Sequence, residues 1–186
     1  MNKSLLIIGA GIYSTVAFDV AESMNFFDKI DFADDQAVST PDGKPVVGKI
    51  SEIKSLSAEY EYAFVAIGNP KIRLTLINKL EDETSLKVWS LVSPQAYVSP
   101  SAQIYKGTIV EPMAVIHAKS VIMTGCIISA GAVVNHASVL CDGVHVDCNA
   151  TVGGTALVPA GTKIFSGEYF VCGVTGQNVS FSDMKK

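Results

Sequence analysis

The sequence predicts a small parallel α/β domain over residues 1–92, followed by a parallel β-helix of about four coils over residues 93–186. Two observations carry this prediction. In the second half of the chain an apolar residue recurs at every sixth position. In the first half, segments typical of buried strands alternate with segments typical of helices. We therefore expect two domains of different class in one chain.

The period of six begins at Val98 and continues to Phe170. It fits neither a helix nor an ordinary strand, and it is typical of hexapeptide β-helices, in which about eighteen residues close one triangular coil. A second column, four residues after each apolar position, holds small residues that suit a corner, with Val144 the exception. The repeat runs out at Glu168, which occupies a position of the small-residue column. Residues 177–186 form a short polar tail. The thirteen apolar positions are Val98, Ile104, Val110, Ile116, Ile122, Ile128, Val134, Leu140, Val146, Val152, Val158, Ile164 and Phe170.

In the first half of the chain, the alternation of strand and helix segments predicts a parallel sheet whose strands are connected by helices. Gln36–Tyr60 is expected to hold loops and short elements, with a turn at Pro41-Asp42-Gly43. The expected strands are Leu5–Ile8, Ile30–Ala33, Tyr62–Ile67 and Lys87–Trp89, and the expected helices run from Gly11 to about Met24 and from Ile72 to Leu80.

Polar and glycine residues follow the strands of this predicted sheet, at the edge where parallel α/β sheets bind ligands. Gly9-Ala10-Gly11 is only part of a dinucleotide-binding motif, because position 14 is serine. The motif alone fits a plain tight turn as well as a phosphate-binding turn, and the two aspartates that follow the second strand fit turn capping as well as binding. The candidate binding residues are Gly9, Gly11, Asp34, Asp35, Gly68 and Asn69.

Composition excludes several classes of function. The net charge is −4, and no basic run precedes the terminal Lys185–Lys186 pair, so nucleic acid is not an expected partner. No segment resembles a signal peptide or is long enough to span a bilayer. The four cysteines form no CxxC pair, which favours a reduced, cytoplasmic protein. From Val92 onward there are only ten charged residues, and a solenoid so poor in charge is expected to cover its outer faces in an oligomer.

Stacking by eighteen residues predicts one candidate for acid–base chemistry. It places His136 between Ala118 and Gly154, which leaves room beside the imidazole. Histidine can accept a proton at neutral pH, and the Gly154 N–H could stabilise an oxyanion. An outward histidine is also common as a plain surface residue, so both interpretations stay open. A zinc site shared with His117 and His145 is not expected, because spacings of 19 and 9 residues place the rings at different turn phases.

The chain resembles the nucleotide-sugar acetyltransferases that have an N-terminal Rossmann-like domain and a C-terminal left-handed β-helix. These include UDP-4-amino-sugar N-acetyltransferases and relatives annotated for sialic-acid O-acetylation. The resemblance implies that His136 is the general base, that His145 lies in the acetyl-CoA site, and that the Gly154 N–H contacts the thioester carbonyl. The matching stretches are Leu5–Gly11, Asp31–Asp35, Phe64–Asn69, Ser93–Ala102 and Val133–His136.

The same resemblance implies the partners. Acetyl-CoA would be the co-substrate, bound between neighbouring prisms of a homotrimer. A nucleotide-linked amino sugar would lie between the α/β domain and His136, near Gly9, Gly11, Asp34, Asp35, Gly68 and Asn69, with the Tyr13 hydroxyl also in reach.

Two departures from the family pattern leave alternatives open. The acidic residue that usually follows the catalytic histidine is Ala137 here, and the usual glycine-histidine pair of the first turn is Ile12-Tyr13. Two alternatives therefore remain beside N-acetylation: an O-acetyltransferase acting on a sugar or sialic acid, and a non-catalytic trimeric protein that binds sugar nucleotides or acts as a scaffold.

Overall fold

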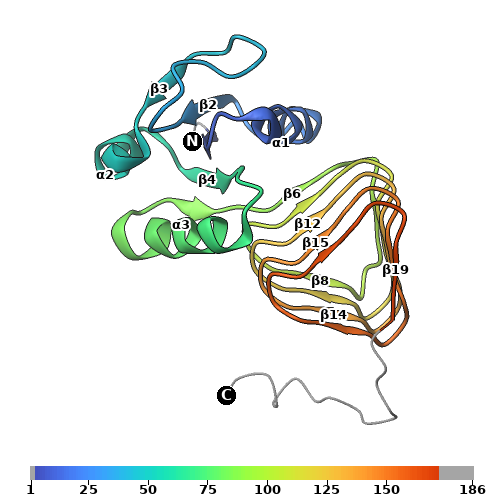
Figure 1. Cartoon of the computed structure of the whole chain (residues 1–186). Helices are drawn as coiled ribbons and strands as arrows, with labels where there is room; N and C mark the ends of the chain where they lie inside the picture. The colour runs from blue at the N-terminus through green and yellow to red at the C-terminus, as the bar shows by residue number, and fades with distance from the viewer. Residues whose placement is uncertain (1–2, 172–186) are drawn as a thin grey trace.

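The computed structural model describes residues 3–171, and its α/β domain lies against one side of a triangular prism (Figure 1). The domain is a five-stranded parallel sheet in the order β3-β2-β1-β4-β5. The two central strands, β1 and β4, are buried along their whole length, as expected for a sheet covered on both faces. Its elements are β1 (Ser4–Ile8), α1 (Ile12–Ser23), β2 (Lys29–Ala33), β3 (Val46–Gly48), α2 (Ile53–Leu56), β4 (Tyr62–Val65), α3 (Pro70–Glu83) and β5 (Lys87–Val88).

The predicted alternation of strands and helices is confirmed, with boundaries shifted by a few residues. The segment expected to hold loops and short elements contains β3, α2 and two single turns of 3-10 helix, Ile50–Glu52 and Ser57–Glu59. Helix α3 begins at Pro70, because Asn69 caps it through its side chain and proline suits a first helical position.

The second half forms the predicted left-handed β-helix, made of two-residue strands in three parallel sheets. Two sheets have five strands, β18-β15-β12-β9-β6 and β19-β16-β13-β10-β7, and the third has four, β17-β14-β11-β8. The strands are β6 (Leu91–Val92), β7 (Tyr97–Val98), β8 (Gln103–Ile104), β9 (Ile109–Val110), β10 (Val115–Ile116), β11 (Val121–Ile122), β12 (Ile127–Ile128), β13 (Val133–Val134), β14 (Val139–Leu140), β15 (His145–Val146), β16 (Thr151–Val152), β17 (Leu157–Val158), β18 (Lys163–Ile164) and β19 (Tyr169–Phe170).

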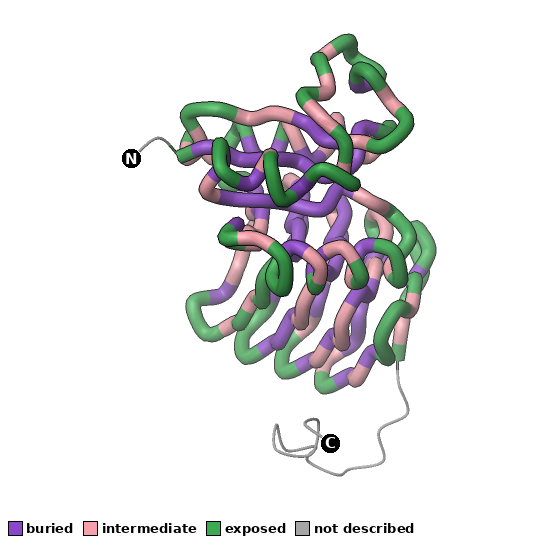
Figure 2. The backbone as a smooth tube through the Cα atoms, turned by 90° about the vertical axis from the view of Figure 1, so that its left-hand side faces the viewer, coloured by how far each residue is buried: buried purple, intermediate pink, exposed green. Residues whose placement is uncertain are grey.

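The six-residue anchors fill the interior of the prism. Those from Val110 to Ile164 are at most 2% exposed, and they pack with the small corner column, which includes Cys126. Figure 2 shows the buried positions recurring along every coil. Because each coil covers its neighbours, stability accumulates along the stack. Cys172 and the polar tail at 177–186 lie outside the described residues.

One sheet of the prism carries the contact with the α/β domain. The outward residues of its first three strands, Leu91, Ile109 and Ile127, join the same apolar cluster as Leu5 of β1. His145 and Lys163 continue this outward column in register on β15 and β18. The covered part of the sheet therefore ends at Ile127, and His145 lies directly beyond it. The division of the chain at residues 92 and 93 stays a prediction.

Candidate active site

The predicted site residues fall into two groups on different corners of the prism. His136 and Gly154 lie at one corner, in the turns that follow β13 and β16, here called the histidine corner. It joins the sheets of β19 and β14 and lies away from the α/β domain (Figure 1). The other candidates lie in the α/β domain or, for His145, on the sheet beside it. Within one protomer the two groups are therefore not brought together.

The stacking of His136 on Gly154 agrees with the prediction from the period of eighteen. A Cβ atom built on Gly154 would lie 2.9 Å from both Cε1 and Nε2 of His136. The imidazole thus occupies the space that any side chain at position 154 would need. His136 is exposed, and its backbone N–H donates to Asn135 Oδ1 at 2.8 Å. Within residues 3–171, no side-chain partner orients the ring.

Within the described residues, the Gly154 amide is left available to bind an oxygen. The neighbouring Gly153 N–H donates to Phe170 O at 2.8 Å, and the Thr155 N–H donates to His136 O at 2.9 Å. Among the hydrogen bonds of the described chain, none uses the Gly154 N–H as its donor. A free amide beside an exposed imidazole can stabilise negative charge on an oxygen while the imidazole accepts a proton.

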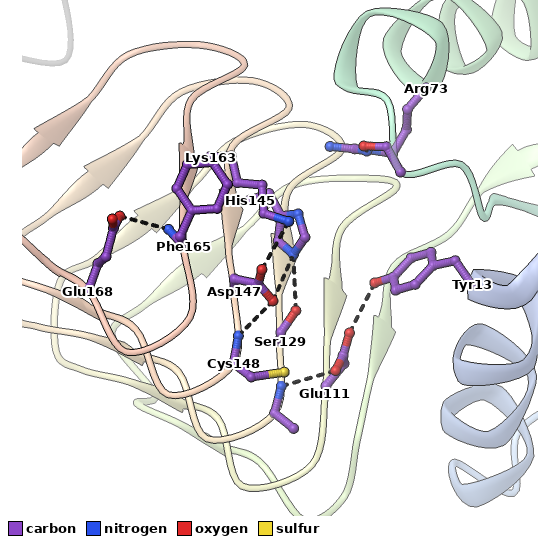
Figure 3. Close-up of polar contacts among 12 residues, drawn as sticks. Tyr13, Arg73, Glu111, Ser129, His145, Asp147, Cys148, Lys163, Phe165 and Glu168 are labelled. Atoms are coloured by element: carbon purple, nitrogen blue, oxygen red, sulfur yellow. Dashed lines mark hydrogen bonds and ion pairs between the residues drawn. The ribbon is translucent and has the colours of Figure 1, made fainter.

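His145 has a different environment on β15 (Figure 3). Its Nε2 lies 3.2 Å from Ser129 Oγ and 3.8 Å from Asp147 Oδ1, and the other Asp147 oxygen pairs with Lys163 Nζ at 2.9 Å. Burial, together with the positive charge of Lys163, lowers the pKa of His145 to about 4. This imidazole is neutral at pH 7, so it acts as a hydrogen-bonding group and is a poor base.

Glu111 is a buried carboxylate that the sequence analysis did not select. One oxygen accepts from the Tyr13 hydroxyl at 3.1 Å, and the other accepts from the Ala130 N–H at 3.0 Å (Figure 3). Burial raises the pKa of Glu111 and that of Tyr13. The Tyr13 hydroxyl, a candidate for substrate contact, is thus bonded within the protein. The one signal in the sequence was that Glu111 is among the few acidic residues of a charge-poor solenoid.

Asp34 and Asp35 bind backbone amides, which is the plainer of the two interpretations of this pair. Asp34 accepts from the N–H groups of Gln36, Ala37 and Ala10 at 2.8, 2.9 and 2.9 Å. Burial opposes its ionisation, but these three hydrogen bonds outweigh burial and hold the pKa of Asp34 below its usual value. Asp35 accepts from the Ser51 N–H at 3.0 Å. Asp34 therefore fixes the turn after β1 against the end of β2.

The glycine and asparagine candidates have different structural roles. Gly9 has a φ of +103°, and a Cβ there would lie 3.1 Å from Ala66 O, so close packing demands glycine. At Gly11 and Gly68 an added Cβ atom would have no such neighbour within 4 Å. Asn69 Oδ1 accepts from the Ile72 N–H at 3.1 Å and caps α3.

Ile12, the departure in the first turn, opens α1 and is exposed. It has no left-handed backbone angle, so glycine is not needed at this position. Among residues 3–171, no group of three or more His, Cys, Asp or Glu side chains is placed to hold a metal ion. No helix in the same range is long and apolar enough to cross a membrane.

A left-handed β-helix that presents an imidazole beside a free backbone amide defines the class of the protein, a hexapeptide-repeat acyltransferase. Comparison with known proteins narrows this class. Residues 4–80 match the model of the PglD N-terminal domain. No curated protein sequence matches the chain.

Three solved structures resemble nearly the whole chain. The acetyltransferase domain of PglB from Neisseria gonorrhoeae is 30% identical, with 92% of each chain covered and a TM-score of 0.82. The same domain in complex with acetyl coenzyme A is 31% identical, covers 91% of this chain and 88% of that chain, and has a TM-score of 0.74. PerB from Caulobacter crescentus, in complex with CoA and GDP-perosamine, is 27% identical. The match covers 92% of this chain and 90% of that chain, with a TM-score of 0.70. The chain belongs to this family of nucleotide-sugar acetyltransferases.

Proposed function

We propose that the protein transfers an acetyl group from acetyl-CoA to the amine of a nucleotide-linked sugar, as a step in surface-glycan or glycoprotein sugar synthesis. The observation that carries this proposal is the His136 ring lying over Gly154, whose N–H donates no hydrogen bond within residues 3–171. The PglB domain bound to acetyl coenzyme A and PerB bound to CoA and GDP-perosamine support the two substrates. PerB is also described as a perosamine N-acetyltransferase, which favours an amine as the acceptor.

The geometry supports direct transfer in two steps. The sugar amine attacks the thioester carbon and gives a proton to His136, while the Gly154 N–H stabilises the developing oxyanion. The tetrahedral intermediate then collapses, the carbon–sulfur bond breaks, and the CoA thiolate takes the proton from the His136 imidazolium. No covalent enzyme intermediate is required.

The two histidines have separate roles in this proposal. His136 is exposed and can exchange protons with substrate and water. His145 has a pKa of about 4 because it is buried near Lys163, so at neutral pH it offers a fixed neutral ring to the acetyl-CoA side of the reaction. The family resemblance implies His136 as the base and His145 as an acetyl-CoA contact, and this difference supports that assignment.

We propose that residues 1–92 hold the nucleotide sugar and that residues 93–186 carry the acyl transfer. The strand-end turns with Gly9, Gly11, Gly68 and Asn69 lie in the α/β domain, away from the histidine corner of the same protomer. A homotrimer, with acetyl-CoA in the groove between prisms, would bring them together. The outward positions of β14 and β17 are apolar and only half-buried (Val139 and Leu157), which supports contact between prisms.

We also propose that the reaction takes place in the cytoplasm, where acetyl-CoA is made. The three cysteines of the described chain, Cys126, Cys141 and Cys148, are free thiols, which fits a reducing compartment.

The test is incubation of the purified protein with acetyl-CoA and a panel of UDP- and GDP-linked sugars, matched pairs bearing an amine or a hydroxyl at the same carbon. The gain of one acetyl group on an amino sugar, read by mass spectrometry, is the expected result. Acetylation of the hydroxyl partners would favour the O-acetyltransferase alternative. No transfer, together with no thermal stabilisation by acetyl-CoA, would favour the scaffold alternative, because a ligand at about 100 times its Kd stabilises by about 2.7 kcal/mol.

A further inference from the structure

Arg73 is a fully buried cation, 1% exposed, that has no carboxylate partner among the described residues. Its guanidinium instead donates to four backbone carbonyl oxygens. Nη1 reaches Ile67 O at 2.7 Å and Gly68 O at 2.8 Å, both in the loop that leaves β4. Nε reaches Gly125 O at 2.7 Å and Nη2 reaches Gly143 O at 3.0 Å, both in turns of the β-helix.

These contacts follow from the way α3 lies on one corner of the prism. The turns at this corner carry glycine at positions spaced by eighteen, and the side chains of α3 occupy the space that larger residues would fill. A Cβ on Gly107 would lie 2.8 Å from Ile77 Cδ1, one on Gly125 3.1 Å from Leu74 Cδ2, and one on Gly143 3.2 Å from Pro70 Cβ. Arg73 lies within this close contact, one turn into the helix.

Apolar packing alone does not explain an arginine at this position. Burial lowers the pKa of Arg73, yet a guanidinium stays charged in proteins, so the buried charge carries a desolvation cost. An unbranched apolar residue would fill the same space without that cost. What the guanidinium adds is a planar fork that fixes four carbonyl groups at once.

Three of the four carbonyls belong to two places that matter for the proposed reaction. Ile67 and Gly68 form the loop next to Asn69, at the proposed nucleotide-sugar site. Gly143 lies two residues before His145, the proposed acetyl-CoA contact. One side chain therefore connects the loop of one proposed substrate site to the coil of the other, across the boundary between the two domains.

We propose that Arg73 is a positioning residue of this enzyme: it holds the Ile67–Asn69 loop, and with it the bound nucleotide sugar, in a fixed place relative to the coil that carries His145. This inference rests on the proposed function. It assigns Arg73 no contact with substrate and no part in proton transfer.

The test compares Arg73→Met with Leu74→Ala, a matched control on the same face of α3 that donates no hydrogen bond to the loop. Arg73→Met is expected to raise KM for the nucleotide sugar at least about tenfold and to lower kcat, because small misplacements of substrate are costly. The Kd for acetyl-CoA should stay within about twofold, since its site lies on the β-helix. Leu74→Ala should lower Tm without changing KM. Equal changes in KM for both variants would reduce Arg73 to a purely structural role.

A second measurement does not depend on turnover. Hydrogen–deuterium exchange of the peptide spanning residues 66–72 should be faster in Arg73→Met than in Leu74→Ala. If the wild-type protein acetylates no nucleotide sugar but this loop loses protection, the proposed function fails while the positioning claim stands. Unchanged protection would overturn the positioning claim itself. If Arg73→Met does not fold, Arg73→Lys, which keeps the charge but loses the fork, carries the same comparison and should show an intermediate KM.

Discussion

Two histidines only nine residues apart show how the same repeat can build two kinds of site. His136 lies in a turn of the histidine corner, exposed to solvent, with backbone as its neighbour. His145 lies on a strand at the edge of the α/β domain, beside Ser129, Asp147 and Lys163. The two histidines occupy different positions of the same six-residue repeat, one in a turn and one on a strand, and only His145 lies beside the face that the N-terminal domain covers.

This difference in environment suits His136 to proton transfer and His145 to hydrogen bonding. A base must exchange its proton during each turnover, so it needs access and a pKa near the working pH. A ring that is neutral at every pH above about 4 cannot alternate between two states, but it can hold a carbonyl or amide in one orientation. The comparison therefore predicts that variants at the two positions will fail in different ways.

The largest effect is expected at His136. His136→Ala should lower kcat at least about 10²-fold, because the amine then has no base, while the Kd for acetyl-CoA changes little. Single-turnover kinetics and calorimetry would measure the two quantities. His117→Ala, at an exposed turn position one coil earlier, is the control and should keep full activity. Wild-type turnover by His136→Ala would remove this residue from the mechanism and end the comparison.

The second effect belongs to His145 and concerns stability against pH. Its folded pKa of about 4 lies below the usual 6.5, so the unfolded chain binds a proton more readily and stability falls as pH drops from 6.5 towards 4. Between pH 7 and pH 5 the loss should be about 2 kcal/mol.

Urea unfolding of the wild type and of His145→Gln at both pH values isolates this term. Glu111 acts in the opposite sense, because burial raises its pKa and its ionisation with rising pH costs stability, but it is present in both proteins and cancels. The wild type should lose more stability than His145→Gln on acidification. An equal loss in the two proteins would mean that His145 is as free to titrate as a surface residue.

The third effect tests the contact beneath the His136 ring. Gly154→Ala places a Cβ atom 2.9 Å from two ring atoms, so the imidazole must rotate away, and kcat should fall about tenfold. The amide N–H survives this change, and the exposed site predicts little loss of Tm. In a His136→Ala background the same substitution should cost almost nothing further. A full tenfold loss in that background would place the damage in the oxyanion site instead of the ring.

Much of the β-helix, and the contact at its histidine corner, could be predicted from sequence alone. A period of six leaves few geometries open, and counting eighteen residues from His136 to Gly154 predicts a contact that the structure contains. Each coil packs on the next, so sequence separation translates directly into spatial contact.

The contacts between the domains could not be predicted in this way. Tyr13 and Glu111 are 98 residues apart, and no periodicity connects them. Arg73 looks like an ordinary surface residue of an amphipathic helix, and only the docking of α3 on the glycine turns buries it. The Asp34 carboxylate was equally consistent with capping and binding until its three amide donors were known. These features depend on how two independently specified domains meet.

The smallest effect is expected at Ala137, the position after the base. Its backbone has a φ of +54°, a left-handed conformation that aspartate and asparagine tolerate better than alanine, so Ala137→Asp and Ala137→Asn should both gain about 0.5 kcal/mol. Only the aspartate adds a carboxylate that can orient and polarise His136, as the acidic residue at this position does in the family pattern.

Ala137→Asp is therefore expected to raise kcat a few-fold over Ala137→Asn, with equal Tm in the two variants. Steady-state kinetics and thermal melts would measure both. A rise in kcat in both variants would mean that the gain comes from relief of the left-handed backbone strain at position 137. No rise in either would mean that contact with Gly154, and the partner groups of the assembled site, already orient the ring as well as a carboxylate could.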